Sequence, residues 1–294
     1  MTESSGLRVS RDRQIAPAGR RSRASGWCGL FLAATAALLA PDLRANDTIA
    51  DTDWYFATTL GTGVYRFGDR TVTVARLPFG RTVRQPDEDR WGIRLKLPVS
   101  VGLYNLDNPV NDVLDRNFAT LAVMPGIELE REVARNWVLK PTASVGYAQD
   151  VVRGNRSTLY EVGTRSAWRH SFERVDFILG NALLYAGNVA QDGMSQNFGV
   201  LSTGLNFIIP TGGLLMNRAS NFGVHFVHYL YFDHLAFALS EDRRRMVTQQ
   251  YELAFTFGTY LPAEVFGFTL DRIGIAFRGG QDFLAFRLVT GFMY

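Results

Sequence analysis

The stretch WGIRLKLPVSVGL, residues 91–103, alternates between two kinds of side chain without a break. Its odd-numbered residues are Trp, Ile, Leu, Leu, Val, Val and Leu, whereas its even-numbered residues are Gly, Arg, Lys, Pro, Ser and Gly. A period of two predicts a β-strand whose two faces meet different surroundings. The stretch is about twice as long as a typical soluble strand, and it is long enough to cross a bilayer at a tilt.

The same alternation recurs along most of the chain and predicts about twelve strands. We place them at 53–66, 71–82, 91–104, 118–130, 137–148, 157–170, 174–187, 196–209, 221–233, 247–260, 265–278 and 282–294. Short turns at 131–136 and 171–174 alternate with longer polar loops at 105–117, 149–156, 188–197 and 233–245. Outer-membrane barrels have this asymmetry between their two ends. The sequence therefore predicts an all-β fold, a single transmembrane antiparallel β-barrel of about twelve strands.

The polar faces of these strands separate a membrane barrel from the alternative, a soluble all-β protein. They hold mainly Gly, Ser and Thr with a few charges, whereas the exterior of a soluble sandwich is rich in Lys and Glu. Aromatic rings that suit the lipid headgroup region lie near the strand ends, namely Trp54, Trp91, Trp137, Tyr147, Trp168 and Tyr294. Both features favour the membrane barrel.

The first 45 residues have the features of an export signal. Arginines up to Arg23 precede the apolar run WCGLFLAATAALLA, and Leu43-Arg44-Ala45 fits a cleavage site. The chain thus divides into a signal peptide at 1–45 and an outer-membrane barrel domain at 46–294. The only cysteine, Cys28, lies in the signal, so we expect no disulfide and no cysteine metal site in the mature chain.

The signal also accounts for the net charge of +3. Residues 1–45 hold seven arginines and three carboxylates, which leaves 24 basic and 25 acidic residues in the rest of the chain. No basic stripe remains that could follow a phosphate backbone. The composition therefore argues against nucleic acid as a partner.

Charged residues on the polar faces of the predicted strands gather in the half of the barrel near the short turns. They are Arg94, Lys96, Glu128, Glu130, Lys140, Arg165, Arg169 and Asp176. Neighbouring strands would bring opposite charges together, either as a salt-bridge lattice that braces the wall or as a constriction that tunes a pore. Because five cations face three carboxylates, a pore lined by this cluster would prefer anions.

The final stretch QDFLAFRLVTGFMY, residues 281–294, continues the alternation to the last residue. One of its faces carries Phe286, Leu288, Phe292 and Tyr294. We expect this strand to turn these residues toward lipid, to close the barrel against the first strand, and to end at the periplasmic rim.

This end and the preceding hairpin, RIGIAFRGGQDF, resemble the closing strands of bacterial outer-membrane barrels, whose terminal aromatic residue is read by the barrel assembly machinery. The segments LPVSVGL, MPGIELE, ASVGYAQD and YEVGTRS are similar to autotransporter β-domains, particularly to solitary autotransporter-like barrels. The resemblance implies a translocator-like barrel in the cell outer membrane of a Gram-negative bacterium. Its partners would be outer-membrane lipid, lipopolysaccharide and the assembly machinery, and a monomer is favoured. Too few residues separate Ala45 from the first predicted strand to supply a passenger or a helix that threads the lumen, so we expect no passenger in cis.

Two other functions stay open, a small-solute pore and a rim hydrolase that acts on outer-membrane lipid or peptide. The hydrolase would use His234 in the predicted outer loop, together with Asp233, Ser240, Glu241 and Asp242. In the same loop Arg243–Arg245 would either touch lipopolysaccharide phosphates or remain solvated. We assign no residue a catalytic, cofactor-binding or metal-binding role.

Overall fold

The computed structural model describes residues 60–67, 70–104, 118–151, 154–191, 195–215, 217–232, 236–240, 243–246, 248–265, 268–281 and 283–294. Within these ranges the regular structure is β-strand, and no helix is long and apolar enough to span a bilayer. The predicted signal peptide at 1–45 and the start of the first predicted strand lie outside the described residues.

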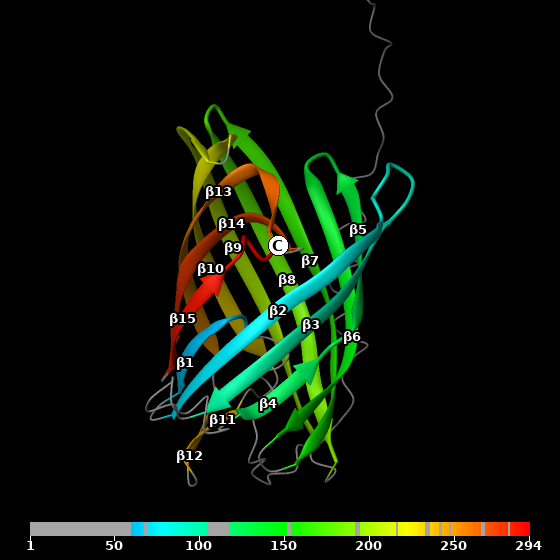
Figure 1. Cartoon of the computed structure of the whole chain (residues 1–294), viewed down its shortest axis with the longest axis vertical. Helices are drawn as coiled ribbons and strands as arrows, with labels where there is room; N and C mark the ends of the chain where they lie inside the picture. Colours follow the sequence, from blue (N-terminus) through cyan, green and yellow to red (C-terminus); the bar gives the residue numbers. More distant parts are fainter. Residues whose placement is uncertain are drawn as a thin grey trace, which may run out of the picture. The chain divides into compact units, whose positions relative to one another are not determined.

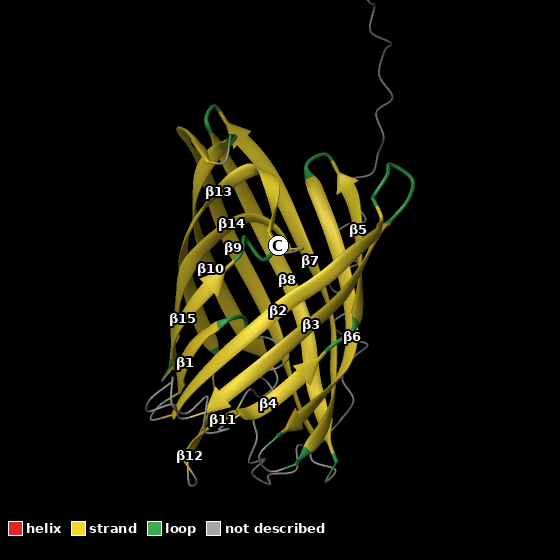
Figure 2. Cartoon of the chain, viewed as in Figure 1, coloured by secondary structure: helices red, strands yellow, loops and turns green. Residues whose placement is uncertain are grey.

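The strands build a closed barrel (Figures 1 and 2). They are β1 (Gly63–Phe67), β2 (Arg70–Arg84), β3 (Gly92–Tyr104), β4 (Phe118–Val123), β5 (Gly126–Ala134), β6 (Trp137–Asp150), β7 (Arg156–Phe172), β8 (Val175–Ala190), β9 (Ser195–Leu215), β10 (Arg218–Phe232), β11 (Ala236–Ser240), β12 (Arg243–Met246), β13 (Gln249–Val265), β14 (Phe268–Gly280) and β15 (Phe283–Val289). Thirteen described strands form one antiparallel sheet, which closes because β1 pairs with β15. The other two, β11 and β12, form a separate hairpin.

Two of the thirteen strands, β4 and β5, share one position in the wall, because both lie between β3 and β6. They are separated at Met124-Pro125, where proline has no N–H to give to a ladder. Single hydrogen bonds bridge the break, from Met124 N to Pro98 O at 3.0 Å and from Val145 N to Pro125 O at 3.0 Å. The thirteen strands thus fill twelve positions, and the predicted antiparallel barrel of about twelve strands is confirmed.

Side chains alternate across the wall as the sequence predicts. On β3, Leu95 and Leu97 point outward and are 49% and 45% exposed, whereas Ser100 points inward and is 4% exposed. Large apolar side chains are exposed on the outward faces of the other strands too, for example Val145, Phe207, Phe257, Ile275 and Phe286. A soluble monomer rarely exposes contiguous apolar patches beyond a few hundred Å². The outer surface of the barrel is therefore suited to an apolar environment.

The end of the chain departs from the prediction. β15 stops at Val289, and residues 290–294 leave the wall and turn into the barrel. Gly291, with a φ of 127°, supplies a backbone conformation that other residues rarely adopt. Phe286 and Leu288 face outward, as expected, at 47% and 46% exposed, but Tyr294 packs in the interior at 8% exposed. The expectation that the strand runs to the rim with Phe292 and Tyr294 on lipid is wrong.

As far as the structure describes them, β1 and β15 are short and leave part of the wall without a paired strand. β1 pairs with β2 only at Arg70–Val74, and β15 pairs with β14 only at Gly274–Gly280. Among the described residues, no strand pairs with 75–84 of β2 on this side or with 268–273 of β14. Figure 1 shows β2 slanting away from β14 and β15, with strands of the far wall behind the gap. We call this gap between β2 and β14 the side opening.

A charged lumen occupied by the C-terminal tail

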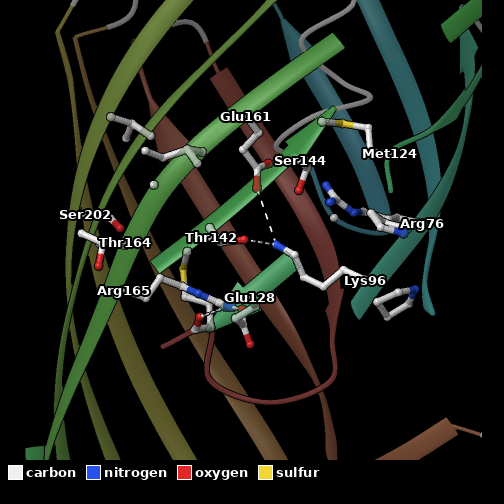
Figure 3. Close-up of a pocket in the computed structure, with 18 of the residues that line it drawn as sticks. Arg76, Lys96, Met124, Glu128, Thr142, Ser144, Glu161, Thr164, Arg165 and Ser202 are labelled. Atoms are coloured by element: carbon white, nitrogen blue, oxygen red, sulfur yellow. Dashed lines mark hydrogen bonds and ion pairs between the residues drawn. The ribbon is translucent and has the colours of Figure 1, made fainter. Parts of the chain in front are cut away.

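A cavity of about 410 Å³ lies inside the barrel, and we call it the inner cavity (Figure 3). Its wall comes largely from the inward faces of β2, β3, β5, β6, β7 and β8. Small residues such as Gly163 and Ala182 leave the space, and charged side chains project into it. Figure 3 shows Lys96 and Arg165 reaching into this space from two different strands.

Ion pairs join the charged side chains on one side of the lumen. Lys96 donates to Thr142 Oγ1 at 2.5 Å and lies 3.8 Å from Glu161. Arg165 pairs with Glu128, which is only 4% exposed. The ladder between β6 and β7 sets Lys140 directly opposite Arg165, and Glu130 lies 3.5 Å from Lys140. Two carboxylates on β5 thus compensate two cations that the register would otherwise leave side by side. We call these ion pairs the first network, and its members are Lys96, Glu128, Glu130, Lys140, Glu161 and Arg165.

The structure brings most of the predicted lumen cluster together. Lys96, Glu128, Glu130, Lys140 and Arg165 form the ion pairs of the first network, and Arg94 lines the same cavity. Arg169 and Asp176 do not line it. Asp176 instead accepts a hydrogen bond from Ser171 Oγ at 2.6 Å, next to the turn between β7 and β8. The cluster divides at these two residues because they lie closer to the turn.

A second network lies on the opposite wall and was not predicted as a site; its members are His225, Glu252 and Arg287. Glu252 of β13 is 2% exposed, pairs with Arg287 of β15, and lies 3.6 Å from His225 Nε2 of β10. Nearby, the Arg278 guanidinium lies 3.7 Å from the centroid of the Tyr229 ring. The alternation of inward and outward side chains along β13 and β15 could have placed Glu252 and Arg287 in the lumen. Only the register between distant strands shows that they meet.

The last five residues, which we call the C-terminal tail (290–294), lie across the lumen between the two networks. Arg165 of the first network donates to the Met293 carbonyl at 2.7 Å. The Tyr229 hydroxyl lies 3.3 Å from Met293 Sδ, and the Phe292 ring centroid lies 5.4 Å from that of His225. The tail therefore contacts both sides of the charged interior.

The tail ends in a notch made by Gly180 of β8 and Gly204 of β9, which are direct cross-strand partners. A Cβ atom at Gly204 would lie 2.6 Å from Tyr294 Cε2. One at Gly180 would overlap the ring and lie 2.7 Å from the Tyr294 Cβ. Contacts this close are not tolerated, so the paired glycines are what admit the aromatic ring.

A larger cavity, of about 1200 Å³, lies at the side opening, and we call it the side cavity. Its lining includes inward residues of the β2–β3 hairpin, such as Arg76 and Lys96, and outward residues, such as Leu77 and Leu95. The side cavity therefore passes around the edge of β2, from the lumen to the outer surface. The charged residues that line the two cavities are Arg76, Arg81, Arg94, Lys96, Arg165, Arg278 and Arg287 against Glu128, Glu161 and Glu252.

Other candidate sites receive no support from the described residues. The predicted hydrolase residues Asp233, His234, Glu241 and Asp242 lie outside them, and of Ser240 and Arg243–Arg245 only the strand positions in β11 and β12 are described. Among described residues, no cluster of three or more His, Cys, Asp or Glu side chains could hold a metal. Neither a model of a known protein family nor a curated protein matches this chain. The geometry of the lumen therefore carries the functional argument.

Proposed function

We propose that the protein is an integral outer-membrane β-barrel that forms a narrow channel for small anionic solutes, closed by its C-terminal tail. The observation that carries this proposal is the position of the tail in the charged lumen. The tail is held by the glycine notch, by two hydrogen bonds at Met293 and by packing of Phe292 and Tyr294 against the interior cluster, all of which are non-covalent contacts that can break and form again. Closure of this kind is reversible, unlike a lumen filled by side chains of the wall.

The proposed location in the outer membrane rests on the outer surface of the barrel and on the contrast between the connections at its two ends. Outward apolar side chains surround the barrel, and a closed antiparallel barrel is one of the few structures that can span a bilayer. Short turns such as Arg135-Asn136 between β5 and β6 contrast with the longer connections predicted at the other end. The predicted signal peptide supports export.

The preference for anions rests on the charges that line the two cavities. Six inward-facing cations, Arg76, Arg94, Lys96, Arg165, Arg278 and Arg287, stand against three carboxylates there. Arg94 has no carboxylate within ion-pair distance among the residues that the structure describes. An excess of cations over carboxylates along a pore raises the local concentration of anions and lowers their barrier to passage. We therefore expect chloride or small carboxylates to pass more readily than potassium.

The second candidate is the translocator-like barrel without a passenger that the sequence resemblance implies. The observation in its favour is Leu60, which is fully buried in the same apolar cluster as Tyr65. At Leu60 the described chain therefore lies on the interior side of the wall, where a segment passing through the lumen would join β1.

Planar-bilayer recording of the refolded barrel tests the channel. We expect brief, infrequent openings for the parent chain. A chain that ends at Val289, and a full-length variant with Phe292→Ala and Tyr294→Ala, should both stay open and prefer anions. The full-length variant is the control for any effect of truncation on folding. Electrical silence of all three proteins, each shown to be folded by its migration on unboiled gels, would contradict the proposal.

A further inference from the structure

No described strand pairs with the edge of β2 at the side opening, and the first residues of this edge offer few free N–H groups. Arg76 directs its backbone groups toward the side opening, because its N–H donates a hydrogen bond to Thr62 Oγ1 there at 3.0 Å, and Pro78 faces the same way two residues later. The same hydroxyl donates to the Arg76 carbonyl at 3.0 Å. Two residues on, Pro78 has no N–H, and proline in sheets is confined to edges and bulges. Arg76 and Pro78 therefore leave no unpaired N–H group toward the opening.

The chain before β1 turns away from this edge. Pairing between β1 and β2 ends at Gly63 and Val74, and Leu60 already lies in the interior cluster with Tyr65. The described chain therefore enters the lumen instead of continuing along β2. An open edge in a bilayer needs a polar partner, because an unsatisfied backbone group costs several kcal/mol in lipid.

The side cavity combines two surfaces that are usually separate. On the lumen side it is lined by the cations Arg76, Arg94, Lys96 and Arg165. On the outer side it is lined by apolar side chains that are 42–50% exposed, namely Leu77, Phe79, Leu95 and Leu97. A ligand that satisfies both surfaces has an anionic head and an apolar chain.

We propose that the side opening binds an anionic phospholipid from the leaflet at the short-turn end of the barrel, with its phosphate among the lumen cations and its acyl chains along Leu77 and Phe79. The phosphate suits this site because an arginine fork can donate two parallel hydrogen bonds to it. Phosphate oxygens would also accept from the edge of β2. The inference rests on the proposed membrane location, and it does not require that the lumen conducts.

Native mass spectrometry of the barrel in a non-ionic detergent tests this inference. Dioctanoyl phosphatidylglycerol should bind at least tenfold more tightly than dioctanoyl phosphatidylcholine, because only the former has a net negative charge. Arg94→Ser should weaken phosphatidylglycerol binding on the order of tenfold, since a charged hydrogen bond is lost. Arg94→Lys, which keeps the charge but not the guanidinium fork, should lose less affinity for phosphatidylglycerol than Arg94→Ser. The matched control is Arg169→Ser, an arginine outside both cavities, which should bind as the parent does.

Other outcomes identify other occupants and overturn the proposal. Equal binding of the two lipids, or equal binding by the parent and Arg94→Ser, would mean that the cations do not select the headgroup. Displacement by millimolar inorganic phosphate would indicate a site for free anions. Binding that appears only after residues 46–59 are deleted would show that this segment fills the opening. Failure of the membrane location is seen separately, in cell fractionation, and failure of the channel is seen in bilayer recordings.

Discussion

Replacing Gly180 with alanine should displace the C-terminal tail and hold the channel open. The new Cβ would overlap the Tyr294 ring, with the Tyr294 Cβ only 2.7 Å away. The wall has little freedom to yield, because Gly180 pairs with Ala167 on one side and Gly204 on the other. Outside the notch the tail is held chiefly by Arg165 and Tyr229, so the tail should move.

The size of the effect follows from the overlap. Forcing a methyl group into a packed site costs about 1–3 kcal/mol. If this cost falls on the closed state alone, the ratio of closed to open channels should fall by about 5- to 150-fold. Single-channel recording in planar bilayers gives this ratio directly, as the fraction of time that the channel spends open.

The matched control is Gly102→Ala, on the inward face of β3. A Cβ there would have its nearest neighbour at 3.7 Å, the Thr120 Cβ, which is an ordinary contact. This variant should behave as the parent does, although it adds the same methyl group to the same kind of strand. Identical open fractions for the parent, Gly102→Ala and Gly180→Ala would refute the reasoning, because the notch would then not control the tail.

Three further predictions concern the ion pairs and the location. Arg165→Ser should raise the open fraction, because it removes the hydrogen bond to Met293, whereas Arg169→Ser should not; equal effects in bilayer recordings would contradict this. Glu252→Gln should leave Arg287 buried without its counter-charge and destabilise the barrel by about 3–5 kcal/mol. Its folded band on unboiled gels should therefore melt at lower temperature than that of Glu130→Gln, whose carboxylate is 38% exposed and should contribute under about 1 kcal/mol. In cells the protein should fractionate with the outer membrane and migrate anomalously when unboiled, and recovery from the soluble periplasm would contradict the location.

Much of the wall could be predicted from the sequence because the signal for it is local. Alternation along a strand fixes which side chains face inward, so Lys96, Glu128 and Arg165 could be placed in the lumen without knowing their partners. Over the described residues the ends of most predicted strands agree with the observed ones within about six residues. The exceptions are the break at Met124-Pro125, the hairpin of β11 and β12 in a predicted loop, and β15, which stops at Val289. These exceptions depend on how neighbouring strands pair.

The tail and the second network could not be predicted in the same way. Residues 290–294 keep the alternating pattern, and nothing within them distinguishes a strand on lipid from a segment inside the lumen. The deciding residues are Gly180 and Gly204, which lie about a hundred residues earlier and become a notch only when β8 and β9 pair in register. Glu252 and Arg287 likewise meet only after the barrel has formed.

The inward turn of the tail also cannot be attributed to the hydrophobic effect if the barrel lies in a bilayer. Phe292 on the outside would contact lipid tails, which are at least as apolar as the charged lumen, so burial alone gives no preference for the inward position. The turn also leaves residues 269–273 of β14 without the ladder partners that a continued β15 would provide. What favours the inward position is close packing in the glycine notch together with the hydrogen bond from Arg165 to Met293. These are few contacts, each worth about 1 kcal/mol or somewhat more. Under the proposed function, a closed state with so small an advantage can be shifted by one methyl group. By turning inward, the same five residues also leave the described part of the wall open beside β14.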